Sequence, residues 1–264
     1  MIGQKKLQYK LNSTTIDNFP KSLILHGESG CGKHTFCKLI EEKYSDWKFV
    51  YISNKIDYDF IESVYLMTSP TFCIIDGNRL SEKEQNVLLK LFEEPPANIN
   101  IIILINVLAQ LIPTVVGRAV VWSFEPYSLD ELKCFSNEKN CDILLYATTP
   151  GQVNEIVENN LEDVIKLCDL IIDKISVASI SNMLSLSNKF KFNNSKKNNE
   201  KGITFSLFFR VFKAVLMKRI YSDSNIKYVN AYKLVSDTFK YLNTSVNDRM
   251  LFESFLFELK FLLI

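Results

Sequence analysis

The sequence contains no hydrophobic run long enough to cross a membrane. Its longest apolar runs, such as residues 101–105, are far shorter than the ~18–20 residues that a transmembrane helix needs. The first ten residues, MIGQKKLQYK, also lack the apolar segment of a secretory signal. These absences predict a cytoplasmic protein without a membrane partner.

The cysteines show no pattern of metal ligands. None of the six is spaced from another as in a CxxC pair, so the sequence predicts neither a zinc site nor a disulfide framework. We expect reduced, mostly buried thiols. They stand at positions 31, 37, 73, 134, 141 and 168.

An excess of charge of one sign is also missing. Lys and Arg number 31 and Asp and Glu number 30, which gives a net charge of +1 and no global field that would attract nucleic acid. Residues 161–264 are net basic and residues 1–160 net acidic, so the two parts are expected to face different partners. A stand-alone DNA-binding module is a weak hypothesis, because no groove-reading helix or mixture of aromatic and basic residues stands out.

The composition is that of a folded protein, with 47% hydrophobic and 23% charged residues. At 264 residues the chain predicts two or three compact units. Up to about residue 127, short apolar β-rich runs alternate with helical patterns, which predicts a parallel sheet covered by helices on both faces. The expected strands are residues 22–26, 47–52, 71–76, 100–105 and 120–124. Everything after residue 127 reads as helical.

The sharpest local pattern is a glycine-rich loop between an expected strand and an expected helix. It matches G-x-x-x-x-G-K, and its backbone N–H groups, the helix N-terminus and Lys33 are suited to cradle nucleotide phosphates. A chance glycine-rich turn is the weaker interpretation, because the flanking strand and helix agree with the motif. The candidate phosphate-binding residues are Gly27, Glu28, Ser29, Gly30, Cys31, Gly32, Lys33, His34 and Thr35.

Several positions depart from what ATP hydrolysis needs. His34 stands where a Ser or Thr hydroxyl would ligate Mg²⁺, and Thr35 lies one residue further round the helix. Asp76, at the end of an expected central strand, can hold Mg²⁺ through water. The next residue is Gly77, where hydrolytic enzymes of this type carry a glutamate that polarises water. We therefore expect weak binding of ATP or ADP and of Mg²⁺, and poor hydrolysis.

The segment after Asp76 contains a helix with clear limits. Ser81 and Glu84 form a capping box that starts the helix, and the prolines that follow Glu94 must end it. Glu93 and Glu94 then lie unfavourably at the negative end of the helix dipole unless they find partners. They form either a solvated acidic helix end or part of an interface or switch.

Read together, DGNRLSEKEQNVLLKLFEEPP, NINIIILIN and LIPTVVGRAVVWSFEP resemble the AAA+ clamp-loader subunits, namely bacterial DNA polymerase III delta prime and gamma and the replication factor C small subunits. The resemblance is strong over residues 1–127 and weak beyond. It implies a P-loop AAA+ α/β domain at 1–127, a helical lid at 128–160 and an all-α collar at 161–264. It also implies that Asn106 is the sensor-1 residue, and that Arg118 reaches a neighbour's nucleotide as an arginine finger.

Further departures fall on the chain's own site. Gln152 occupies the lid position of a sensor-2 Arg or Lys, and Gly117 and Ala119 flank Arg118 in place of Ser and Cys. The pattern favours a delta-prime-like subunit that helps an ATP-driven ring load a sliding clamp onto primed DNA, with other loader subunits, the clamp and primer-template DNA as partners. The alternative is a self-sufficient P-loop AAA+ ATPase.

Overall fold

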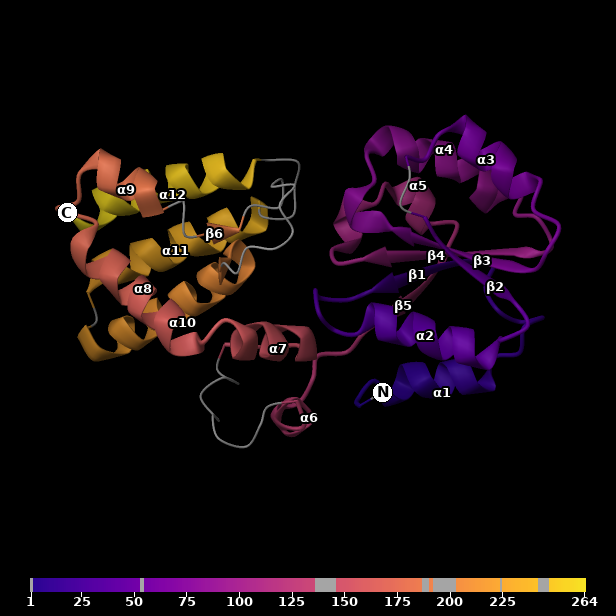
Figure 1. The fold of residues 1–264 in the computed structure, drawn as a ribbon, viewed down its shortest axis with the longest axis horizontal. Coiled ribbons are helices and arrows are strands. Elements are labelled where there is room, and N and C mark those ends of the chain that lie inside the picture. Colours follow the sequence, from indigo (N-terminus) through magenta and orange to yellow (C-terminus); the bar gives the residue numbers. More distant parts are fainter. Residues whose placement is uncertain are drawn as a thin grey trace. The chain divides into compact units, whose positions relative to one another are not determined.

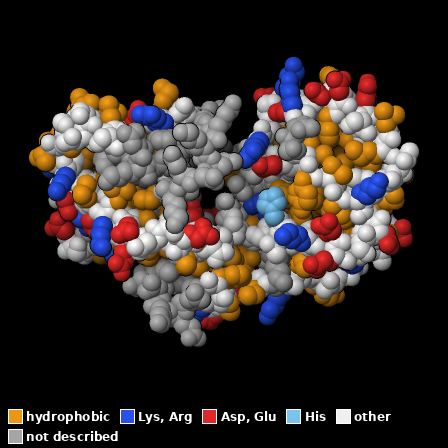
Figure 2. Space-filling model, in the orientation of Figure 1, with side chains coloured by type: hydrophobic (Ala, Val, Ile, Leu, Met, Phe, Trp, Pro, Cys, Tyr) orange, Lys and Arg blue, Asp and Glu red, His pale blue; other side chains and the backbone are white. Residues whose placement is uncertain are grey.

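The computed structural model describes residues 2–52, 55–135, 146–186, 190–191, 203–223, 225–241 and 247–264. The chain divides into two compact units, Met1–Glu131 and Leu132–Ile264. Within the described residues, no helix has the length and apolar character required to span a bilayer. On the face drawn in Figure 2, positive and negative side chains of the described residues are interspersed.

The first unit is built on a five-stranded parallel sheet (Figure 1). The strand order is β2-β3-β4-β1-β5, and every pairing is parallel, as the sequence predicted. The strands are β1 Ser22–His26, β2 Lys48–Ile52, β3 Thr71–Asp76, β4 Ile99–Ile105 and β5 Val120–Ser123. β4 is buried along its whole length because strands flank it on both sides and helices cover it.

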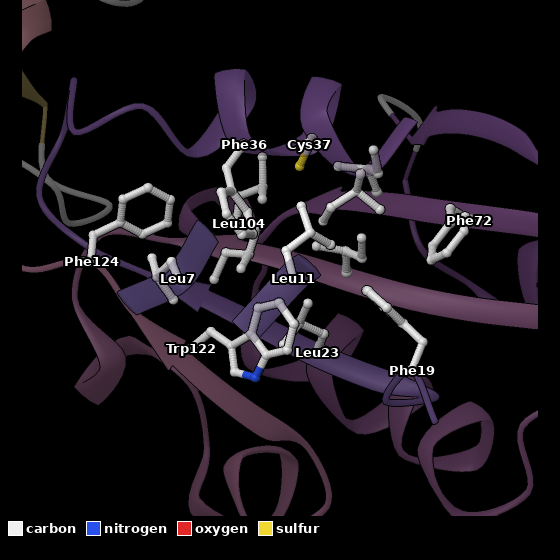
Figure 3. Packing of buried hydrophobic residues seen from close by; sticks show 14 of the residues in the cluster. Leu7, Leu11, Phe19, Leu23, Phe36, Cys37, Phe72, Leu104, Trp122 and Phe124 are labelled. Atoms are coloured by element: carbon white, nitrogen blue, oxygen red, sulfur yellow. The ribbon is translucent and has the colours of Figure 1, made fainter. Parts of the chain in front are cut away.

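Helices lie on both faces of this sheet, and each face has its own core. In the aromatic core between the sheet and helices α1 and α2, the ring of Phe19 contacts Tyr44, Phe72 and Trp122 edge to face. Figure 3 labels Phe19, Phe72 and Trp122 in this core. The opposite core is aliphatic and packs α3 and α4 on the sheet. The helices of this unit are α1 Lys5–Ser13, α2 Lys33–Lys43, α3 Tyr58–Tyr65, α4 Glu82–Glu93 and α5 Pro113–Val116, with 3-10 turns at Gly77–Arg79 and Leu108–Gln110. The short helix α6 Leu129–Lys133 spans the division between the two units.

The second unit is a helical bundle with a phenylalanine core. Rings from α10 and α12 pack together, for example Phe209 and Phe255 with centroids 4.9 Å apart and Phe205 and Phe252 at 5.1 Å. Its helices are α7 Pro150–Glu158, α8 Leu161–Lys174, α9 Ile180–Leu186, α10 Phe205–Asp223, α11 Ile226–Tyr241 and α12 Asp248–Leu263.

The purely helical prediction for the second unit missed one small sheet. Phe190–Lys191 and Ile203–Thr204 pair as the two-residue strands β6 and β7. A pair this short has no period-2 pattern that the sequence could show. Cys141 and the rest of residues 136–145, part of the region predicted to be helical, lie outside the described residues. The separation of a lid from a collar at residue 160 stays a prediction.

Candidate phosphate-binding site

The glycine-rich loop lies where the sequence predicted it, between β1 and α2. Gly30 and Gly32 have φ of +79° and +99°, which side chains rarely adopt. Gly27 is required for a different reason. A Cβ at Gly27 would lie 2.7 Å from Cβ of Phe124 and 2.8 Å from Sγ of Cys31, so only glycine fits there.

The loop opens on a pocket of about 340 Å³, within the size range of small-molecule sites. The predicted site residues Asp76 and Asn106 line it together with most of the loop, so the carboxyl ends of β3 and β4 meet α2 here. The lining residues are Ser29, Gly30, Gly32, Lys33, His34, Thr35, Asp76, Asn78, Leu104 and Asn106. Of the other loop residues, Gly27 and Cys31 are buried and Glu28 is exposed, and none of the three lines the pocket.

Lys33 is only 7% exposed, and its ammonium group is fully hydrogen-bonded, as a buried charge must be. Its ammonium donates to the carbonyl oxygens of Gly27 at 2.5 Å and Glu28 at 3.0 Å, and to Oδ1 of Asn106 at 2.7 Å. Burial lowers the pKa of Lys33, and the neighbouring Cys31, Asp76 and Glu28 partly oppose that shift.

Asn78 belongs to the site although sequence reasoning did not find it. Its Nδ2 donates to Oδ1 of Asp76 at 2.8 Å, and its Oδ1 accepts the backbone N–H of Asn106 at 2.8 Å. Its own backbone N–H also donates to Oδ1 of Asp76 at 3.1 Å. A hydrogen-bonded chain therefore runs from Asp76 through Asn78 and Asn106 to Lys33.

The residue after Asp76 cannot be a glutamate without rearrangement. Gly77 is buried, and a Cβ there would lie 2.6 Å from Cγ2 of Ile103 and 3.0 Å from the carbonyl oxygen of Leu104. A side chain at the position where hydrolytic P-loop enzymes carry a water-polarising glutamate would therefore require the sheet to shift.

The donor set does not suit magnesium, which the fold family implies beside a nucleotide phosphate. Oδ1 of Asp76 already accepts two hydrogen bonds from Asn78, and Oδ2 lies 3.4 Å from Nε of Arg79. His34 presents an imidazole where a hard oxygen ligand would stand. Its ring stacks on Tyr51, with centroids 6.4 Å apart.

The segment before α1 packs against the segment after β5, next to the loop. Nε2 of Gln4 donates to the carbonyl of Glu125 at 2.7 Å, and Oε1 accepts the Glu125 N–H at 2.9 Å. The hydroxyl of Tyr127 donates to the Cys31 carbonyl at 2.8 Å. These bonds fix the wall of the unit behind the loop.

Arg118 lies outside the pocket. It follows α5, and its Nη2 is 2.8 Å from Oε1 of Glu93 at the end of α4, while Nη1 donates to the carbonyl of Thr114 at 3.1 Å. Its side chain is 40% exposed. Glu93 thus has the partner that its place at the helix C-terminus calls for.

Gln152 lies in the second unit and is 4% exposed. Its Oε1 accepts the backbone N–H of Thr148 at 2.8 Å and the Thr148 hydroxyl at 3.0 Å. The side chain is therefore committed to its own helix start.

Comparison with known proteins supports this architecture. Residues 50–128 match the family described as DNA polymerase III, delta subunit. No curated protein sequence matches the chain significantly.

Solved structures give the fold. Two variants of RuvB from Thermotoga maritima are 15% and 14% identical, each with a TM-score of 0.50 over 96% of this chain, covering 82% and 83% of their own chains. A DNA polymerase III gamma subunit-related protein of the same organism is 13% identical over 98% of this chain and 99% of its own, with a TM-score of 0.44. Residues 50–128 are therefore similar to the DNA polymerase III delta subunit family, and the parallel sheet fits the P-loop AAA+ fold.

Proposed function

We propose that the chain is a delta-prime-like subunit of a sliding-clamp loader. It hydrolyses little or no ATP itself and gives Arg118 to the nucleotide of a neighbouring ATPase subunit. The observation that carries the proposal is the location of Arg118. The guanidinium lies outside its own phosphate pocket, is 40% exposed, and pairs with a glutamate that is itself half exposed.

An exposed ion pair of this kind is easily given up. Such pairs contribute about 0–1 kcal/mol, so a neighbour's phosphates can compete with Glu93 for the guanidinium. A guanidinium supplied in trans stabilises the charge on a transferring phosphoryl group and makes hydrolysis depend on assembly.

The chain's own pocket supports the same role, because it is poorly suited to hydrolysis. Asp76 is engaged by Asn78 and Arg79, and Gly77 has no room for a side chain. Among the described residues that line the pocket, no carboxylate other than Asp76 is present to polarise water. Self-sufficient ATPase activity, the alternative, would need another carboxylate to take that part.

The proposed partners are the other loader subunits, the clamp and primer-template DNA within the assembled ring. The division into a nucleotide-binding domain at 1–127, a lid at 128–160 and a collar at 161–264 belongs to the proposal. Support for a collar contact comes from α12, where Phe261 is 77% exposed near the end of the helix.

The test compares ATP turnover by the purified chain, by a catalytic loader subunit from the same source, and by their complex. We expect negligible turnover by the chain alone and stimulated turnover in the complex. Arg118→Ala should abolish the stimulation without preventing assembly, and Arg118→Lys should restore only part of it, because the ammonium lacks the planar fork.

Lys5→Ala is the matched control, since it removes an exposed positive charge from α1 on the other face of the sheet. It should leave stimulation unchanged. Strong turnover by the chain alone, or full stimulation by Arg118→Ala, would refute the proposed role.

A further inference from the structure

We infer that the phosphate pocket takes a nucleoside di- or triphosphate without a divalent cation, with His34 donating to the phosphate oxygens and the positive charge of Lys33 beside them. The inference rests on the proposed function, in which this pocket holds a nucleotide and does not turn it over. It assigns the chemical form of the ligand and gives His34 a role.

The first observation concerns the oxygens that a magnesium ion would need. Mg²⁺ requires near-octahedral oxygen ligands at about 2.0–2.1 Å. The amide oxygen of Asn78 accepts from the Asn106 backbone, and that of Asn106 accepts from Lys33. Both oxygens of Asp76 face donors on Asn78 and Arg79. A cation would have to break these contacts to gain a carboxylate or amide ligand, and the Thr35 hydroxyl, which also lines the pocket, supplies at most one neutral oxygen.

The second observation concerns the residue at the metal-ligand position. His34 is exposed and lines the pocket beside Lys33. Within the described part of the chain its ring nitrogens make no hydrogen bond, and Tyr51 supports one ring face. An imidazole N–H donates hydrogen bonds to phosphate oxygens, whereas a neutral imidazole nitrogen is a poor ligand for Mg²⁺.

Together, the two observations mean that hydrogen-bond donors and a positive charge, rather than metal ligands, surround the phosphates. In a metal-dependent loop, a hydroxyl and an acid position a cation. Here the acid accepts hydrogen bonds from Asn78 and faces Arg79, the positive charge of Lys33 lies at the pocket, and donors face the ligand from His34 and the N–H groups at the start of α2. Such a site binds the free polyanion directly.

The experiment measures the affinity of the full chain for fluorescent ADP and ATP analogues, once with excess magnesium and once with a chelator. We expect dissociation constants that agree within about twofold. A loss of tenfold or more in chelator, about 1.4 kcal/mol, would overturn the inference, as would the absence of binding in both conditions.

Three variants assign the residues. His34→Ser restores the hydroxyl, and we expect it to bind several-fold more weakly than the native chain in chelator and to gain affinity with magnesium. Lys33→Met should lose binding in both conditions. Lys38→Met removes the same charge from an exposed position of α2 and should bind normally. Unchanged binding by His34→Ser in chelator would refute the part given to His34.

Tryptophan fluorescence melts show that each variant is folded, because both tryptophans, Trp47 and Trp122, lie in the first unit. The outcome is separable from that of the proposed function. Stimulation of a neighbour is judged on Arg118, which is not part of this pocket. Metal-dependent binding with an intact Arg118 effect would refute only the inference made here.

Discussion

Gly77 offers a direct test of whether the sheet itself excludes a catalytic side chain. A Cβ at this position would lie 2.6 Å from Cγ2 of Ile103 and 3.0 Å from the carbonyl oxygen of Leu104. Ile103 is fully buried, and the Leu104 carbonyl is part of β4, so neither can move freely. Overpacking of this kind costs about 1–3 kcal/mol, because it forces off-rotamer side chains and backbone shifts.

We therefore expect Gly77→Ala to lower the unfolding free energy of the first unit by about 1–3 kcal/mol. With a urea slope of ~2 kcal/mol/M, the midpoint would fall by roughly 0.5–1.5 M. Tryptophan fluorescence isolates this unit, since the second unit contains no tryptophan. Gly77→Glu should be at least as destabilised and should not acquire ATPase activity.

Gly117→Ala is the matched control within the same unit. Its Cβ would meet only the Pro113 carbonyl, at 3.3 Å, and its φ of −68° suits any L-residue. We expect a change within about 1 kcal/mol. If Gly77→Ala were as stable as the native chain, or if Gly77→Glu hydrolysed ATP, steric exclusion would not explain the glycine.

Three further predictions follow from individual contacts. Ser81→Ala removes the complete capping box of α4 and should lower the stability of the first unit by about 1 kcal/mol in urea unfolding followed by tryptophan fluorescence. Glu155→Gln leaves Arg210, whose side chain is 13% exposed, without its ionic partner. Breaking a fully buried ion pair costs ~3–5 kcal/mol, so we expect the unfolding free energy of the second unit, followed by circular dichroism, to fall by at least ~2 kcal/mol. The control Glu158→Gln changes an exposed residue and should leave that free energy nearly unchanged. Burial lowers the pKa of Lys33, and only the charged form of Lys33 attracts phosphate. Nucleotide affinity should therefore begin to fall, as the pH is raised, below the ordinary lysine pKa of 10.5. An affinity that does not change up to pH 10.5 would contradict this prediction.

The elements that the sequence predicted well are those whose signal is local. The strands at residues 22–26 and 71–76 were predicted with their observed limits, because each is a short apolar run bounded by polar or turn residues. The capping box of Ser81 and Glu84 is present with both of its hydrogen bonds. β4 begins at Ile99, one residue before the prediction.

What the sequence could not provide depends on contacts between distant segments. Asn78 became part of the site only when β3 and β4 brought it next to Asn106, 28 residues away. The partner of Glu93 could not be named either, because Arg118 follows a different helix. In both pairs the two residues lie too far apart in the sequence for a local pattern to relate them. The hydrogen-bonded chain across the pocket therefore cannot be predicted from the sequence.

The same contacts determine how much free energy it costs to release Asp76, Lys33 or Arg118 from its present partners. Moving Asp76 or Lys33 into a catalytic geometry would break several hydrogen bonds around a buried ammonium, each worth about 1.5–3 kcal/mol when a charged group takes part. Releasing Arg118 breaks one exposed ion pair with Glu93, worth at most about 1 kcal/mol, and one exposed hydrogen bond to the Thr114 carbonyl. Of these three charges, the guanidinium is therefore the one that the fold gives up most readily, which favours chemistry at a neighbouring subunit over chemistry in its own pocket.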